Sequence, residues 1–295
     1  MHGKIQCCTL LLSLAAALAA GQAPQPPQNP LARHYREGEQ LVYRMNGINE
    51  SWHYSIRAEG VVKKDPSGTY LEEYRWAGMN SDGQPIALSP QTESFRQRVT
   101  LEPGINPSVP DLTKVDPKLI GPITDFMTFY SDLWLAAKIG QLNHAGDHFY
   151  LPIGIPSSWA DGSHVLVGVS AIDFDLTLKS LDPASGKAVL VVRHVPPAKP
   201  QITMPAAWMQ TPVADTQNNW VELVKQPDGK FLGGVGQENF TVELTVSLAD
   251  GKILAGHMDN GVNTIERICD DQALTRCGEP VRHSIVRTID LTLEP

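Results

Sequence analysis

The chain has 295 residues, of which 19% are charged and 42% hydrophobic, a globular composition that excludes a chain disordered throughout. Its formal net charge is −8, and its longest basic run is Lys63-Lys64. Nucleic acid is therefore disfavoured as a partner, because binding to phosphates needs clustered Lys and Arg.

The first residues have the pattern of a cleavable secretion signal, which is predicted to span residues 1–19. A positive segment containing Lys4 precedes an apolar run over residues 5–16, and a small-x-small pattern ends at Ala19. Cleavage is expected after Ala19, with Ala20 as the alternative. The apolar run is too short to span a bilayer, and no later stretch reaches that length. The sequence predicts an exported protein, periplasmic or secreted, with no transmembrane segment after cleavage.

A polar leader rich in Pro and Gln follows over residues 20–34. Its composition cannot build a core and is typical of an extended tether. The remainder, residues 35–295, is predicted to form a single β-rich domain.

Alternation of apolar and polar side chains predicts strands through the first third of this domain. The pattern runs over residues 41–45, 52–59, 70–76 and 94–101. Turn signals rich in Asp, Pro and Gly separate these runs, as at residues 65–68. The regular succession of short strands and turns favours a meandering antiparallel sheet.

One helix is predicted, over residues 124–142. Apolar and aromatic side chains recur there at helical spacing and form one broad face. Thr124 is the expected N-cap, because Pro122 is interpreted as the end of the preceding loop.

The second half of the domain is again strand-like. Residues 240–248 alternate without exception, and Asp250 and Gly251 then predict a tight hairpin turn. A change of phase near Asp173 predicts a bulge or bend within one long strand over residues 165–178. The glycine-rich residues 233–236 lack the context of a phosphate-binding loop and predict a flexible loop or a bulged strand end. Further strands are expected over residues 188–195, 220–225 and 284–293.

After removal of the signal, Cys269 and Cys277 are the remaining cysteines. Exported proteins reside where disulfides persist, so a bridge is predicted that closes a hairpin loop and contributes about 2.5 kcal/mol. The alternative, a redox or metal pair, is disfavoured because the eight-residue spacing lacks the C-x-x-C geometry.

Standard catalytic and nucleotide-binding motifs are absent, and no cofactor is indicated. His144, Asp147 and His148 are the candidate metal ligands, since two His four residues apart can bind one metal from one helix face. Gly146 favours another interpretation, in which these residues end the helix.

Aromatic side chains gather in two parts of the sequence, the early strands and the helix. They predict either an ordinary core or an apolar groove between sheet and helix that holds a lipid-like ligand. The candidate ligand contacts are Trp52, Tyr54, Tyr74, Trp76, Phe126, Phe129 and Trp134.

A short stretch after the leader resembles the opening of certain exported bacterial domains of unknown function. Residues 36–45 read REGEQLVYRM, and in those domains a Gly-Glu-x-Leu-x-Tyr stretch opens a long, curved antiparallel sheet. The order of elements also resembles the lipoprotein-carrier and related half-barrel folds. This resemblance covers about ten residues of the chain. It implies an incomplete barrel whose apolar concave face is filled by helix, and it assigns no binding residue.

The expected fold is thus a curved antiparallel sheet or incomplete barrel with one amphipathic helix packed on it. Three functions remain open. The first is a non-enzymatic binder of a lipid, another apolar small molecule or an envelope protein. The second is a metal- or carboxylate-dependent hydrolase that uses His144 and His148 with His257 or His283, and the third is a purely structural envelope domain.

Overall fold

The computed structural model describes residues 29–295, except residues 50, 104, 106–111, 113–114, 154–156 and 162–165. The predicted signal and most of the leader lie outside the described residues. The strands are β1 Gln40–Asn49, β2 Trp52–Lys64, β3 Tyr70–Ser81, β4 Gln84–Ile86, β5 Gln97–Val99, β6 His148–Leu151, β7 Ser157–Asp161, β8 Leu166–Ser170, β9 Asp173–Asp182, β10 Lys187–Val195, β11 Trp220–Lys225, β12 Phe231–Ser247, β13 Ile253–Cys269 and β14 Val281–Leu293. The helices are α1 Pro90–Ser94, α2 Pro117–Ile139 and the 3-10 helix η2 Ala207–Gln210.

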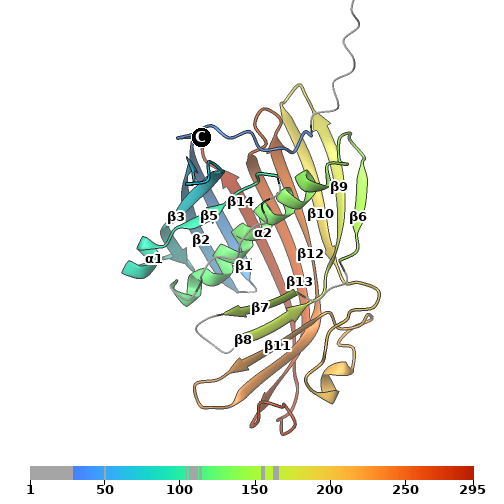
Figure 1. Ribbon diagram of the computed structural model, residues 1–295. Helices are drawn as coiled ribbons and strands as arrows, with labels where there is room; N and C mark the ends of the chain where they lie inside the picture. The colour runs from blue at the N-terminus through green and yellow to red at the C-terminus, as the bar shows by residue number, and fades with distance from the viewer. Residues whose placement is uncertain are drawn as a thin grey trace, which may run out of the picture.

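The strands form one curved antiparallel sheet, and α2 lies diagonally across its concave face (Figure 1). The main strand order is β4-β3-β2-β1-β14-β13-β12-β10-β9-β6. The predicted fold class is confirmed, in the form of an open sheet that does not close into a barrel.

Strand β12 is long enough to pair with different strands at its two ends. Residues 240–247 pair with β10, whereas residues 231–236 pair with β11, which in turn pairs with β8. The sheet therefore divides beyond β12, and β7, β8 and β11 form a smaller flap below α2 (Figure 1).

The predicted hairpin around Asp250 is confirmed. Gly251 has a φ of 69° and its N–H donates to the carbonyl of Ser247 at 2.8 Å, which is the tight turn between β12 and β13. Both strands are 17 residues long and continue well past the alternating segment.

The predicted helix is present, but its predicted bounds, residues 124–142, were wrong. Helix α2 begins at Pro117, after Asp116, and ends before Gly140, whose φ is 64°. Pro122 lies inside the helix. It removes one main-chain hydrogen bond, and the complete burial of Phe126 offsets this cost together with the rest of the apolar face.

Two further strand predictions require correction. The predicted long strand over residues 165–178 is two strands, β8 and β9, which pair with different neighbours. The glycine-rich residues 233–236 are an ordinary part of β12, hydrogen-bonded on both sides. Periodicity alone could not show either point, because it reports which face a side chain occupies but not which strand lies beside it.

Two apolar cores lie on opposite faces of the sheet. The larger is buried under α2 and includes Val242, while the smaller lies near η2 and includes Val235 and Met209. Val235 and Val242 are seven residues apart on one strand, so their side chains point to opposite faces. At the η2 end of the sheet, the core therefore lies on the convex face.

The predicted disulfide is confirmed. Cys269 at the end of β13 is bonded to Cys277 with an S–S distance of 2.02 Å, and it is buried in the smaller core. The bridge closes the connection from β13 to β14.

Packing against the sheet begins within the segment assigned to the leader. Leu31 is fully buried, and the side-chain amide of Asn29 donates to the carbonyl of Ala137 at 2.7 Å. In the described part of the chain, no helix has the length and apolarity needed to cross a membrane.

Candidate functional site

Five strands align their side chains in one line across the concave face. Cross-strand pairing runs from Phe174 through His194, Phe240 and Asn260 to Arg287, on β9, β10, β12, β13 and β14. Directly paired residues project from the same face of a sheet, so these five side chains form a continuous line, here called the transverse row.

Helix α2 lays two buried carboxylates on this row. Asp125 pairs with Arg287 and accepts a hydrogen bond of 2.9 Å from the Tyr54 hydroxyl. Asp132 pairs with His194 Nε2, its two oxygens lying 2.8 and 2.9 Å away. Two turns of helix separate the two aspartates, so they share one helix face. Burial raises the pKa of both, against the opposing effect of Arg287 and His194.

A third carboxyl group lies next to the row, away from α2. The amide of Asn260 donates to Glu238 Oε1 at 3.2 Å, and Arg287 Nη1 lies 3.4 Å from Asn260 Oδ1. Burial raises the pKa of Glu238, while Arg287 opposes the shift. The Arg287 side chain is 24% exposed, so water reaches this guanidinium beyond the edge of α2.

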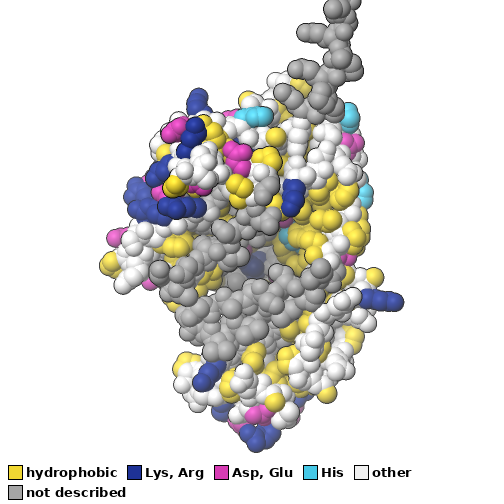
Figure 2. Space-filling model, viewed as in Figure 1, with side chains coloured by type: hydrophobic (Ala, Val, Ile, Leu, Met, Phe, Trp, Pro, Cys, Tyr) yellow, Lys and Arg dark blue, Asp and Glu magenta, His cyan; other side chains and the backbone are white. Residues whose placement is uncertain are grey.

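The concave face beside these polar groups is apolar and partly exposed. Phe240, Ile285 and Trp220 are all half-buried there. Gly236 lies under the Trp220 ring, and a Cβ at this position would lie 2.4 Å from the carbonyl of Asn263. The lack of a side chain at Gly236 therefore lets the Trp220 ring and the backbone of Asn263 pack closely against β12. Figure 2 shows a hollow on this face, with basic and histidine side-chain atoms inside it.

Another titratable group lies farther along this face. The Glu222 side chain lies over Gly234, where an added Cβ would lie 2.9 Å from its Cγ. Glu266 pairs with Gly234 from the other side, and its Oε2 is 3.4 Å from His283 Nε2. Burial, and then the neighbouring charge of Glu266, raise the pKa of Glu222 to about 7.

We expect Glu222→Gln to stabilise the protein at pH 8 and not at pH 4. Between its ordinary pKa of 4.5 and about 7, the unfolded state ionises Glu222 while the folded state keeps it protonated, so stability falls as pH rises. The gain in the free energy of unfolding at pH 8 is about 1–3 kcal/mol. Urea denaturation at a series of pH values measures it. Glu243→Gln, at a side chain that is 43% exposed, is the control, and parallel curves for Glu222→Gln and the parent would contradict this assignment.

The aromatic residues predicted as ligand contacts lie mainly on α2 or beneath it. Rings of Tyr74 and Phe126 are 5.0 Å apart, and Phe129 is fully buried. Helix α2 thus occupies the surface on which the apolar ligand was expected to lie. Of the seven, the buried ones are Tyr54, Tyr74, Trp76, Phe126 and Phe129, and the half-buried ones are Trp52 and Trp134.

The predicted metal ligands belong to separate pairs. His144 Nδ1 lies 3.4 Å from Asp147 Oδ2, whereas His148 pairs with Asp175 on β9. Within the described residues, no group of three or more His, Cys, Asp or Glu side chains could hold a metal ion.

The histidines of the hydrolase hypothesis are also far apart. Four strand-to-strand steps separate His148 from His257, which is about 19 Å at the usual spacing. His257 pairs with Asp290 at 2.7 Å, and His283 lies 3.4 Å from a different carboxylate, that of Glu266. The structure does not bring these side chains together.

A fully buried polar cluster, which the sequence did not predict, anchors the N-terminal segment. Arg33 bonds Glu39 and Glu72, both at 2.9 Å. Tyr74 and Tyr130 donate their hydroxyls to Glu72 at 2.7 and 2.6 Å. The Arg33 side chain is 0% exposed and that of Glu72 1%, so this cluster stabilises the fold and cannot contact a ligand.

Comparisons with known protein families, curated proteins and solved structures found no match. The site is therefore interpreted from its own residues.

Proposed function

We propose that the chain is an exported, non-enzymatic protein that binds an amphiphilic small molecule on the concave face beside α2. The observation that supports this most directly is the position of Arg287. Its guanidinium is partly exposed at the boundary between a polar row and a half-buried apolar surface. A molecule with a polar head and an apolar body matches both parts of this surface.

The head group in this proposal carries oxygen acceptors. A guanidinium has five N–H donors, and Asp125 and Asn260 take only part of them. Glu238 has a raised pKa and in its protonated form also donates a hydrogen bond. A carboxylate or carbonyl at this place would receive hydrogen bonds from both groups.

The apolar body of the ligand would lie toward the flap. Phe240, Ile285 and Trp220 offer half-buried apolar surface on the same face. The upper part of the face cannot serve in this way, because α2 fills it.

Binding is proposed in preference to catalysis because the charged groups of the row are arranged as closed pairs. Arg287 is paired with Asp125 and His194 with Asp132, both with buried aspartates. Such pairs hold the orientation of their side chains, which suits recognition of a fixed head group. Export is proposed from the signal-like residues 1–19, and the disulfide suits an oxidising compartment.

We expect Ile285→Trp to abolish ligand binding. Ile285 belongs to the half-buried apolar surface of the concave face. A larger ring at this position would occupy the space in which the ligand is proposed to bind. Native mass spectrometry of the mature protein purified from its own host would show a bound mass that is lost on unfolding. The Ile285→Trp variant would lack that mass.

The matched control is Val286→Trp. Val286 is the next residue on β14, points to the opposite face and is 63% exposed. This variant should keep the bound mass. A parent protein without any bound small molecule, or equal retention by both variants, would refute the proposal.

A further inference from the structure

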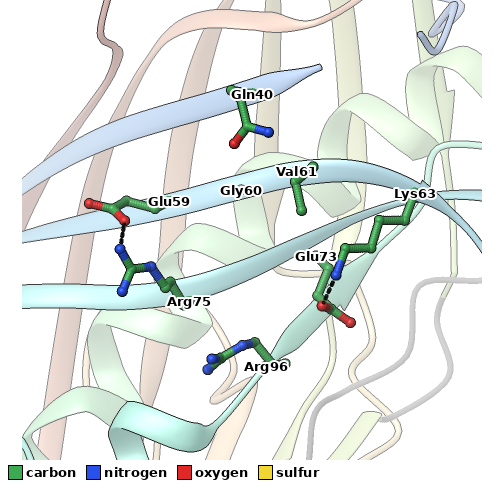
Figure 3. Close-up of a pocket in the computed structure, with 8 residues that line it drawn as sticks. All are labelled: Gln40, Glu59, Gly60, Val61, Lys63, Glu73, Arg75 and Arg96. Atoms are coloured by element: carbon green, nitrogen blue, oxygen red, sulfur yellow. Dashed lines mark hydrogen bonds and ion pairs between the residues drawn. The ribbon is translucent and has the colours of Figure 1, made fainter. Parts of the chain in front are cut away.

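The convex face of β2, β3 and β5 carries a pocket of about 240 Å³ on the side of the sheet opposite α2 (Figure 3). Its charged lining consists of Lys63, Arg75 and Arg96 together with Glu59 and Glu73. In Figure 3 these side chains approach one space from neighbouring strands and from the segment after α1.

Both carboxylates of this pocket are neutralised twice. Glu59 pairs with Arg75 and, at 2.8 Å, with Arg57. Glu73 pairs with Lys63 at 2.7 Å and with Arg98 at 2.8 Å. The hydrogen bond from Lys63 is the main cause that lowers the pKa of Glu73, so this group is ionised at neutral pH.

Arg96 adds a cation that forms no ion pair with the described carboxylates. Its Nη1 donates to the carbonyls of Glu93 and Phe95, each at 2.8 Å, which fixes the direction of the guanidinium. The lining of the pocket thus holds three cations and two carboxylates. Its charge is positive, although the whole chain has a net charge of −8.

We propose that this pocket binds a phosphate-class oxyanion, either free or as the ester of a larger molecule. Lys63, Arg75 and Arg96 reach the pocket from different elements, and a tetrahedral group directs oxygens toward several donors at once. The two carboxylates hold Arg75 and Lys63 in place, and the three cations of the lining outnumber them. This site lies on the opposite face from the proposed ligand recess, and the inference does not depend on it.

Titration of the disulfide-intact protein with inorganic phosphate at low ionic strength tests the proposal. Binding followed by calorimetry should weaken at least about fivefold in Arg96→Gln and again in Arg75→Gln, since each removes a charge-assisted hydrogen bond. Arg96 makes no ion pair within the part of the chain that the structure describes, so Arg96→Gln should unfold like the parent. The matched control is Arg282→Gln, an exposed arginine on β14 bonded only to the carbonyl of Val213 among the described residues.

Loss of binding in the two pocket variants but not in Arg282→Gln would support the site. Equal weakening in all three variants would show a general charge effect and overturn it, as would the absence of phosphate binding. A second titration uses vesicles of phosphatidylcholine with phosphatidylglycerol. Vesicle binding with the same dependence on Arg96 would identify a lipid headgroup as the source of the phosphate, whereas phosphate binding alone would identify a soluble one.

Discussion

Replacing Arg33 by Met is expected to lower the free energy of unfolding by about 3–5 kcal/mol. The side chain is fully buried and neutralises Glu39 and Glu72, and the apolar replacement would leave Glu72 buried without a cation. Equilibrium denaturation in urea at pH 7 measures the loss.

Arg44→Met is the matched control for this experiment. Arg44 is also paired with a glutamate, at 2.7 Å, but its side chain is 61% exposed. An exposed pair contributes little, so a loss below about 1 kcal/mol is expected. If the two variants lost similar stability, the buried cluster would not be the anchor of the N-terminal segment.

The second large effect concerns the contact between Phe129 on α2 and Gly256 on β13. Phe129→Ala should cost about 3–5 kcal/mol, because the ring is fully buried. Gly256→Ala alone should also destabilise, since its Cβ would lie 2.7 Å from Cδ1 of that ring. With the ring removed, the same Gly256→Ala change should stabilise by about 0.5–1 kcal/mol, because alanine is less flexible and the clash with the ring is gone. The remaining close atom, Leu244 Cδ2 at 3.2 Å, can then shift into the space left by the ring.

The test is whether the effect of Gly256→Ala on the free energy of unfolding changes sign when Phe129 is replaced by Ala. Chemical denaturation of the parent, the two single variants and the double variant measures this effect. Gly261→Ala serves as control, because a Cβ at Gly261 would have no neighbour within 4 Å. Its effect should be the same with and without Phe129. An equal effect of Gly256→Ala in both backgrounds would mean that α2 does not rest on the sheet at this contact.

Local sequence patterns predicted most of the individual elements. The strand at residues 220–225 was predicted to the residue, because alternation and turn signals lie on both sides of it. The disulfide followed from the number of cysteines and their spacing. Both features depend on residues close together in the chain, which is what periodicity and turn chemistry report.

The candidate site could not be predicted in the same way. Members of the transverse row come from five strands, and alternation assigned each to a face without naming its neighbour. Nothing in the sequence therefore distinguished Arg287 from the other residues of the predicted strand at residues 284–293. The basic pocket was missed for the same reason, since Lys63 and Arg75 approach each other only when β2 and β3 pair.

The helix start was missed for a different reason. Pro122 was interpreted as the end of the loop before the helix, whereas it lies inside α2, where burial of the apolar face outweighs one lost hydrogen bond. The Asp132–His194 pair then depends on where that helix lies on the sheet, which no local pattern contains.

The position of β14 has a consequence for biogenesis. This strand joins β1 to β13, and Arg44 and Glu294, paired across β1 and the end of β14, lie 250 residues apart in the chain. Until β14 has emerged from the ribosome, the earlier strands form two separate sheets with open edges at β1 and β13. Open edges invite pairing with other chains. A chain with this order of strands completes its main sheet only once β14 is available, and until then its open edges favour pairing with other chains.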